Sequence, residues 1–123
     1  MSAISQAQRA YAPGAGSIRT PRSVEFEVIA RITHRLKRAI QTQEKRILID
    51  VLYENRKLWN TLAAEVASST NALPQELRAR IFYLAEFTNQ HTSKVLRNQA
   101  TAVPLLEINA AILGGLKSEG SPA

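Results

Sequence analysis

The sequence predicts an all-α protein, a small bundle of about four helices preceded by a flexible N-terminal tail. Apolar residues recur at the three- and four-residue spacing of an amphipathic helix in four successive segments. No segment alternates apolar and polar residues as a half-buried strand would. The chain has 123 residues, of which 45% are hydrophobic and 21% charged, which suits one compact domain. Four amphipathic helices with short connections must bury their apolar faces against one another, which gives a bundle.

Residues 1–20 are predicted to be a tail and linker. The Pro-Gly-Ala-Gly-Ser sequence at residues 13–17 interrupts any helix there. Ile4, Ala7 and Tyr11 would share one side of a short helical turn. A docking segment and a frayed terminus are both compatible with this pattern.

The first helix is expected to begin at Thr20 and Pro21 and to end at residues 41–43. Threonine can accept a backbone N–H as an N-cap, and proline suits the first helical position, where its missing donor costs nothing. The residues that share its apolar face are Phe26, Ile29, Thr33, Leu36 and Ile40.

The second helix is predicted at residues 44–67, and a polar residue lies at the centre of its apolar face. That face consists of Leu48, Val51, Leu52, Asn55, Trp59, Leu62, Ala63 and Val66. An unpaired amide buried there would cost about 1–3 kcal/mol. Asn55 must therefore find a hydrogen-bond partner or face an interface.

Two further helices complete the domain, which is predicted at residues 21–117. The third is expected to open at Leu73 and Pro74 and to end near Asn98, and the short fourth to start at residues 101–104. Gly114 and Gly115 weaken its last turn, and residues 118–123 are predicted to be a disordered tail. The third helix carries Leu77, Ile81, Leu84, Thr88, His91 and Val95 on its apolar face, and the fourth carries Leu105, Ile108, Ile112 and Leu116.

The sequence indicates no enzymatic activity, cofactor site or metal site. Cysteine is absent, and the two histidines, His34 and His91, lie on different predicted helices without ligand spacing. Dinucleotide-binding, phosphate-binding and nucleophile motifs are missing. We expect His91, which lies in an apolar face, to be a buried imidazole with a hydrogen-bond partner.

Positive charge is concentrated between residues 31 and 46. The net charge of the chain is +6, and this segment contains Arg31, Arg35, Lys37, Arg38, Lys45 and Arg46. Such a segment attracts nucleic acid, an anionic membrane surface or an acidic protein, and it is also typical of a solvated helix face. No targeting or membrane-spanning segment is recognisable, so a cytoplasmic protein without membrane insertion is expected.

Apolar residues outside the main faces indicate an interaction surface. Phe82 and Tyr83 lie away from the apolar face of the third helix, and Leu106 and Leu113 lie outside that of the fourth. Surplus apolar residues of this kind mean either a helix buried on two sides or a groove for a partner. Both interpretations remain open at this stage.

Two motifs carry a family resemblance. Residues 54–59 read Glu-Asn-Arg-Lys-Leu-Trp, and residues 77–87 read Leu-Arg-Ala-Arg-Ile-Phe-Tyr-Leu-Ala-Glu-Phe. With Arg19–Arg22, His91 and Asn109, they make the chain resemble the FlaF family of bacterial flagellar biosynthesis regulators over residues 3–117. The resemblance implies a regulator that promotes flagellin production and export, opposite to the FlbT regulator, by binding flagellin as a secretion chaperone. Whether FlbT is contacted directly stays open.

For such a role we predict a partner-binding site on the second and third helices. Aromatic residues and arginines dominate the binding energy of protein interfaces. The predicted contacts are Trp59, Arg78, Arg80, Phe82, Tyr83 and Phe87. Competing interpretations are that Trp59 and Phe87 pack inside and that Arg80 forms an ion pair with Glu54 or Glu65. The alternative function is regulation of flagellin message, through RNA binding by the basic segment 31–46.

Overall fold

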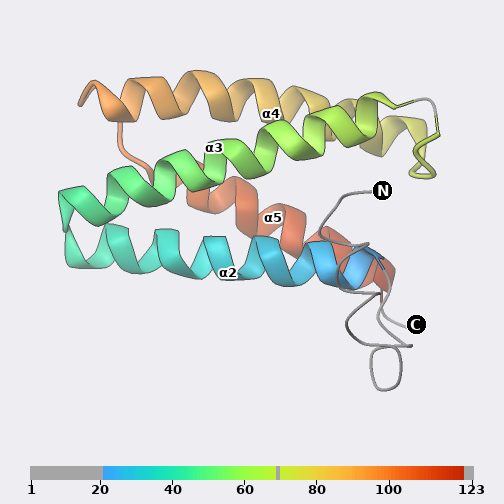
Figure 1. Cartoon of the computed structure of the whole chain (residues 1–123), viewed down its shortest axis with the longest axis horizontal. Coiled ribbons are helices and arrows are strands. Elements are labelled where there is room, and N and C mark those ends of the chain that lie inside the picture. Colours follow the sequence, from blue (N-terminus) through green and yellow to red (C-terminus); the bar gives the residue numbers. More distant parts are fainter. Residues whose placement is uncertain (1–20, 69, 121–123) are drawn as a thin grey trace.

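Successive helices of the bundle run in opposite directions (Figure 1). The computed structural model describes residues 21–68 and 70–120, with side chains for 26–68 and 70–115. The helices are α2 (Pro21–Thr42), α3 (Lys45–Ala67), α4 (Gln75–Leu96) and α5 (Val103–Gly120). No strand occurs within these ranges. The prediction of an all-α bundle of about four helices is confirmed.

The helix boundaries follow the predicted ones closely except in α5. This helix has 18 residues and ends at Gly120, so residues 118–120, predicted as part of a disordered tail, are helical. Glycine lowers helix stability by only about 1 kcal/mol per residue, and nothing in residues 116–119 interrupts a helix. The predictions for residues 1–20 and 121–123 fall outside the described residues.

Two helices end in a left-handed residue that is not glycine. Asn98, with φ 59°, follows α4. Its N–H donates to the carbonyl of Val95 at 3.0 Å, and the next N–H, of Gln99, donates to the carbonyl of Lys94 at 2.8 Å. These two bonds satisfy carbonyls of the last turn. Gln43, with φ 57°, follows α2 and donates its N–H to the carbonyl of Ala39 at 3.1 Å.

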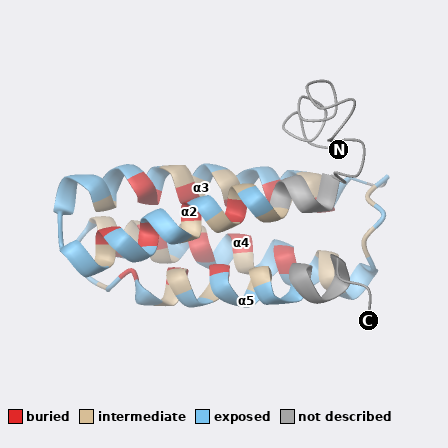
Figure 2. Ribbon diagram, turned by 90° about the horizontal axis from the view of Figure 1, so that it is seen from below, coloured by how far each residue is buried: buried red, intermediate tan, exposed pale blue. Residues whose placement is uncertain are grey.

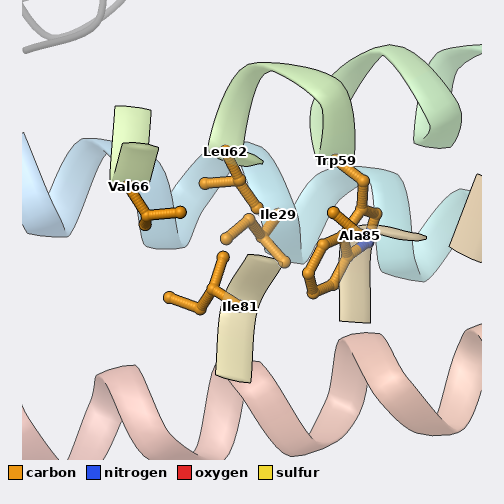
Figure 3. Packing of buried hydrophobic residues seen from close by; sticks show 6 residues of the cluster. All are labelled: Ile29, Trp59, Leu62, Val66, Ile81 and Ala85. Carbon is orange, nitrogen blue, oxygen red and sulfur yellow. The ribbon is translucent and has the colours of Figure 1, made fainter. Parts of the chain in front are cut away.

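The core consists of two apolar clusters near opposite ends of the bundle. Buried residues recur along all four helices (Figure 2). The first cluster, in which side chains of α2, α3 and α4 point towards one another (Figure 3), contains Ile29, Trp59, Leu62, Val66, Ile81 and Ala85. The second contains Leu36, Val51, Leu52, Val95, Ala102 and Leu105.

A belt of four fully buried polar residues separates the clusters: Asn55, Thr88, Thr92 and Asn109. Asn109 Nδ2 donates to Asn55 Oδ1 at 2.8 Å, and Thr92 Oγ1 donates to the carbonyl of Thr88 at 2.6 Å. The partner expected for Asn55 is therefore Asn109, on a different helix. Burying the two amides together offsets part of their desolvation cost.

The four helices do not contact their neighbours equally. α3 packs extensively against α4, and α2 packs against both α3 and α5, whereas α4 and α5 have the weakest contact. Arg56 of α3 donates to the carbonyl of Asn89 at 2.9 Å and to Ser93 Oγ at 2.8 Å, both in α4. Within the described residues no hydrogen bond joins α4 to α5 directly. The bundle is thus loosest along the α4–α5 seam.

Candidate protein-binding site

Trp59 lies in the core and not on the surface. Its side chain is fully buried in the first apolar cluster, and its Nε1–H donates to Asn109 Oδ1 at 2.9 Å. The prediction that Trp59 is a partner-binding anchor is therefore wrong. The cause is its position on the apolar face of α3, one turn from Asn55, and the competing interpretation of internal packing is correct for this residue.

Arg78 stabilises the junction between α3 and α4. Its Nε donates to the carbonyl of Val66 at 2.9 Å, and its Nη2 donates to the carbonyl of Ser68 at 2.9 Å. Both carbonyls belong to the C-terminal end of α3, where no further helical turn supplies N–H groups. The guanidinium group of α4 thus caps the helix that precedes it, and its donors at these positions are used within the chain.

The exposed aromatic residues of α4 lie on two different flanks. Phe82 is 45% exposed, Tyr83 68% and Phe87 36%. Phe82 lies one turn from Arg78, on the flank that faces α3. Phe87 stacks on His91, with 5.4 Å between ring centroids, and a ring nitrogen of His91 (Nε2) lies 2.8 Å from the carbonyl oxygen of Thr101, just before α5. Phe87 therefore lies on the flank that faces α5.

Arg80 also lies on the flank of α4 that faces α5. It is exposed and lies one turn from Tyr83 and two turns from Phe87. The expected ion pair with Glu54 is absent, because Glu54 instead pairs with Arg35 of α2. In the part of the chain that the structure describes, no ion pair joins Arg80 to Glu65 either, although both line the same cavity.

A cavity of about 120 Å³ opens along the α4–α5 seam. It lies at the end of the bundle near the α3–α4 loop, and residues of the first apolar cluster form part of its wall. Its walls are mainly apolar and come from all four helices, and α5 contributes only Ala111, Ile112 and Gly115. Arg80 lines the cavity, whereas Tyr83 and Phe87 do not. We call the cavity, together with Tyr83 and Phe87 farther along α4, the α4–α5 groove. Of the six predicted residues, three belong to it.

The basic segment occupies the outer side of the bundle. Arg31, Arg35, Lys37, Arg38, Lys45 and Arg46 are all exposed. Arg31, Arg35 and Arg38 share one side of α2, since they are three, four and seven residues apart. The pairing of Arg35 with Glu54 neutralises part of this side.

Further expectations concern His91, metals and membranes. His91 has the expected hydrogen-bond partner in Thr101, but its ring is only partly buried. Among the described residues no group of three His, Cys, Asp or Glu side chains is placed to hold a metal. Over the same part of the chain, no helix combines the length and apolarity needed to cross a membrane.

Sequence reasoning missed the cavity. In the sequence, Ala111 and Gly115 are simply small residues in the last predicted helix. Their spacing of four, which places both on one side of the helix, is the one signal in the sequence that indicates a cavity there. Which seam is hollow depends on the helix arrangement, because small residues alone allow close packing as readily as a cavity.

The comparison with known families identifies the chain. No curated protein and no solved structure matches it. Residues 7–116 match the family described as Flagellar protein FlaF, and this match covers most of the chain. The protein therefore belongs to the FlaF family of flagellar proteins.

Proposed function

We propose that the protein promotes flagellin production and export by binding flagellin as a cytoplasmic secretion chaperone or adaptor. Its membership of the FlaF family supports a flagellar role. The observation that supports protein binding in particular is the α4–α5 groove, where an apolar cavity is lined by Arg80 and the exposed Tyr83 and Phe87 follow Arg80 along α4 by one and two turns. Apolar clefts flanked by aromatic residues and an arginine are typical of sites that bind a partner helix.

The groove suits an amphipathic segment. A helix laid between α4 and α5 would cover Tyr83 and Phe87 with its apolar side and keep its polar side in water. Covering that surface would shield the apolar residues of an unassembled flagellin segment from aggregation. The exposed Arg80 at the edge would contact polar or acidic groups of the partner.

The alternative function is RNA-level regulation of flagellin message. It rests on the exposed basic residues of the segment 31–46. Binding of this kind depends on release of counterions from phosphates, so its affinity falls steeply with salt. No exposed aromatic residue lies within that segment to stack on bases, which favours the first proposal.

A titration with both ligands tests the proposal. The purified protein is titrated with flagellin and, separately, with flagellin message RNA, each at low and at moderate salt. We expect flagellin to bind with little dependence on salt, and Tyr83→Ala and Phe87→Ala each to weaken it about tenfold or more. Phe82→Ala is the matched control, because it removes an exposed aromatic residue from the opposite flank of α4.

Two outcomes would contradict the proposal. If RNA binds and flagellin does not, and RNA affinity collapses as salt rises, the basic segment is the functional site. If flagellin binds but only Phe82→Ala weakens it, the partner lies on the α3 flank of α4 and the groove is not the site.

A further inference from the structure

A second apolar pocket lies at the other end of the bundle. The connection from α2 to α3 and the connection from α4 to α5 both lie at this end (Figure 1), and residues of both line the pocket. Its volume is about 330 Å³, and its apolar walls include Ile40, Leu48, Val95 and Leu96. We call it the loop-end pocket. It shares no lining residue with the cavity of the α4–α5 groove.

Exposed apolar side chains continue the loop-end pocket onto the surface. Ile49 of α3 is 36% exposed and Val103 of α5 is 43% exposed, and both line the pocket. Ile47 is as exposed as Val103 but does not line it. Engineered apolar cavities of about 150 Å³ hold one benzene molecule, and the loop-end pocket has about twice that volume. It therefore has room for two apolar side chains.

Polar side chains stand at this pocket in strained positions. In the described part of the chain, two residues other than glycine have a left-handed φ, Gln43 and Asn98, and both line the pocket. Glycine is the usual residue at such helix ends, because a Cβ atom is unfavourable there. Among the described residues, neither side-chain amide has a hydrogen-bond partner. Both amides are thus available to the backbone of a bound peptide.

The side-chain charge around the loop-end pocket is positive. Lys45 lines the pocket, and no Asp or Glu of the described residues does. The charged residues that line it or adjoin a lining residue in the sequence are all exposed, and they comprise five cations (Arg38, Lys45, Arg46, Lys94 and Arg97) and two carboxylates (Glu44 and Asp50). Two helices begin and two end here, so their dipoles largely cancel. The net side-chain charge of +3 therefore attracts an anionic partner.

An acidic protein segment suits these features better than other occupants. No aromatic residue lines the pocket to stack on a nucleic-acid base. Much of the apolar surface is recessed in a pocket, which suits inserted side chains better than a flat membrane. Residues 1–20 contain no Asp or Glu, and a second copy of the chain would bring its own net charge of +6 towards this positive end.

We propose that the loop-end pocket binds an acidic amphipathic segment of a partner protein, which inserts two apolar side chains and places its carboxylates against the surrounding cations. This inference goes beyond the proposed function, because the pocket and the cavity of the α4–α5 groove lie at opposite ends of the bundle. It does not require that flagellin bind. A protein with a separate partner site at each end would connect two partners.

Three labelled synthetic peptides test the chemistry by fluorescence anisotropy at low and at moderate salt. The first is an acidic helix of about 18 residues with leucines along one side and glutamates elsewhere. The second has serine in place of the leucines, and the third has lysine in place of the glutamates. We expect the first to bind at least about tenfold more tightly than either control, and its affinity to fall as salt rises.

Matched substitutions locate the binding. Ile49→Ser should weaken binding of the acidic peptide at least about fivefold, whereas Ile47→Ser, the same change outside the pocket, should leave the affinity within about twofold. Lys45→Gln should weaken binding and make it less dependent on salt. Gln43→Gly should also weaken it, although this substitution relieves strain at the end of α2. A loss of binding in that variant would therefore not be a loss of folding.

Several outcomes would overturn the inference. One is that the acidic peptide binds no more tightly than its controls, and another is that Ile47→Ser weakens it as much as Ile49→Ser. Binding of phosphatidylglycerol vesicles or single-stranded RNA that Ile49→Ser weakens, without binding of the peptide, would assign the pocket to that ligand instead. Self-association that Ile49→Ser abolishes in sedimentation would make a second copy the occupant. If Ile49→Ser weakens flagellin binding, the pocket serves flagellin and no separate partner.

Discussion

The indole N–H of Trp59 donates a hydrogen bond to the side-chain oxygen of Asn109, 2.9 Å away, in the fully buried centre of the bundle. Asn109 in turn donates to Asn55. One amide of α5 thus satisfies two polar groups of α3. Because both partners are fully buried, neither could turn to water if Asn109 were lost.

We predict that Asn109→Ala lowers the free energy of unfolding by at least about 2 kcal/mol, since it leaves a buried indole N–H and a buried amide oxygen without partners. Urea denaturation followed by circular dichroism measures this. Glu107→Ala, at an exposed position of the same helix, is the control and should change stability by less than about 0.5 kcal/mol. Equal effects of the two substitutions would show that the buried hydrogen bonds contribute nothing net.

Arg78 and Arg80 should separate stability from binding. Arg78→Ala removes two hydrogen bonds to carbonyls at the end of α3, and we expect a loss of about 1–2 kcal/mol with little change in flagellin affinity. Arg80→Ala should leave stability nearly unchanged and weaken flagellin binding. Chemical denaturation and the same binding titration check both variants. If instead Arg78→Ala weakens binding and leaves stability unchanged, Arg78 belongs to the binding site, as the sequence analysis predicted.

Gln43 is a position where glycine should improve the fold. Its φ of 57° places a side chain in the left-handed region, which costs about 1 kcal/mol or more for a residue with a Cβ. We expect Gln43→Gly to raise the free energy of unfolding by about 0.5–1 kcal/mol. Gln41→Gly, inside the last turn of α2, should lower it by a similar amount. Thermal melts of the two variants should move in opposite directions, and a fall for both would contradict the strain argument.

The ion pair between Arg35 and Glu54 should contribute little. Both side chains are partly exposed, and exposed pairs typically contribute less than about 1 kcal/mol. Glu54→Gln should therefore lower the free energy of unfolding by less than about 1 kcal/mol at low salt, and the difference should vanish in 1 M salt. A larger loss that persists in high salt would mean that Glu54 has a structural role beyond this pair.

The sequence was sufficient for the helices and for most core positions. Leu36, Leu52 and Ile81 lie where the 3.6-residue period puts them, because each amphipathic face is a local property of its own segment. The same logic identified Asn55 as a buried polar residue that needs a partner. Local patterns predict which side of a helix is buried, whatever it packs against.

The misplaced site residues depend on which helices are neighbours. The sequence allowed two interpretations of Trp59, a partner-binding anchor or a core residue. The hydrogen-bond partner that holds its indole N–H inside the bundle is Asn109, fifty positions away in the sequence. Arg78 reaches the end of α3 only because α4 runs back along α3. The groove exists because one of four helix seams is loose, a difference that four similar amphipathic patterns do not encode.

The packing of α2 against α5 has a consequence for how the protein is made. Of these four helices, α2 is synthesised first and α5 last. The part of α2 that packs against α5 therefore stays uncovered until the whole stretch between Thr42 and Val103 has been translated. At the roughly 5–20 residues per second of ribosomal synthesis this takes several seconds, whereas a helix hairpin forms within microseconds to milliseconds. The nascent chain therefore leaves the side of α2 that packs against α5 uncovered even after α3 has packed on α2, and the bundle closes only after α5 has emerged.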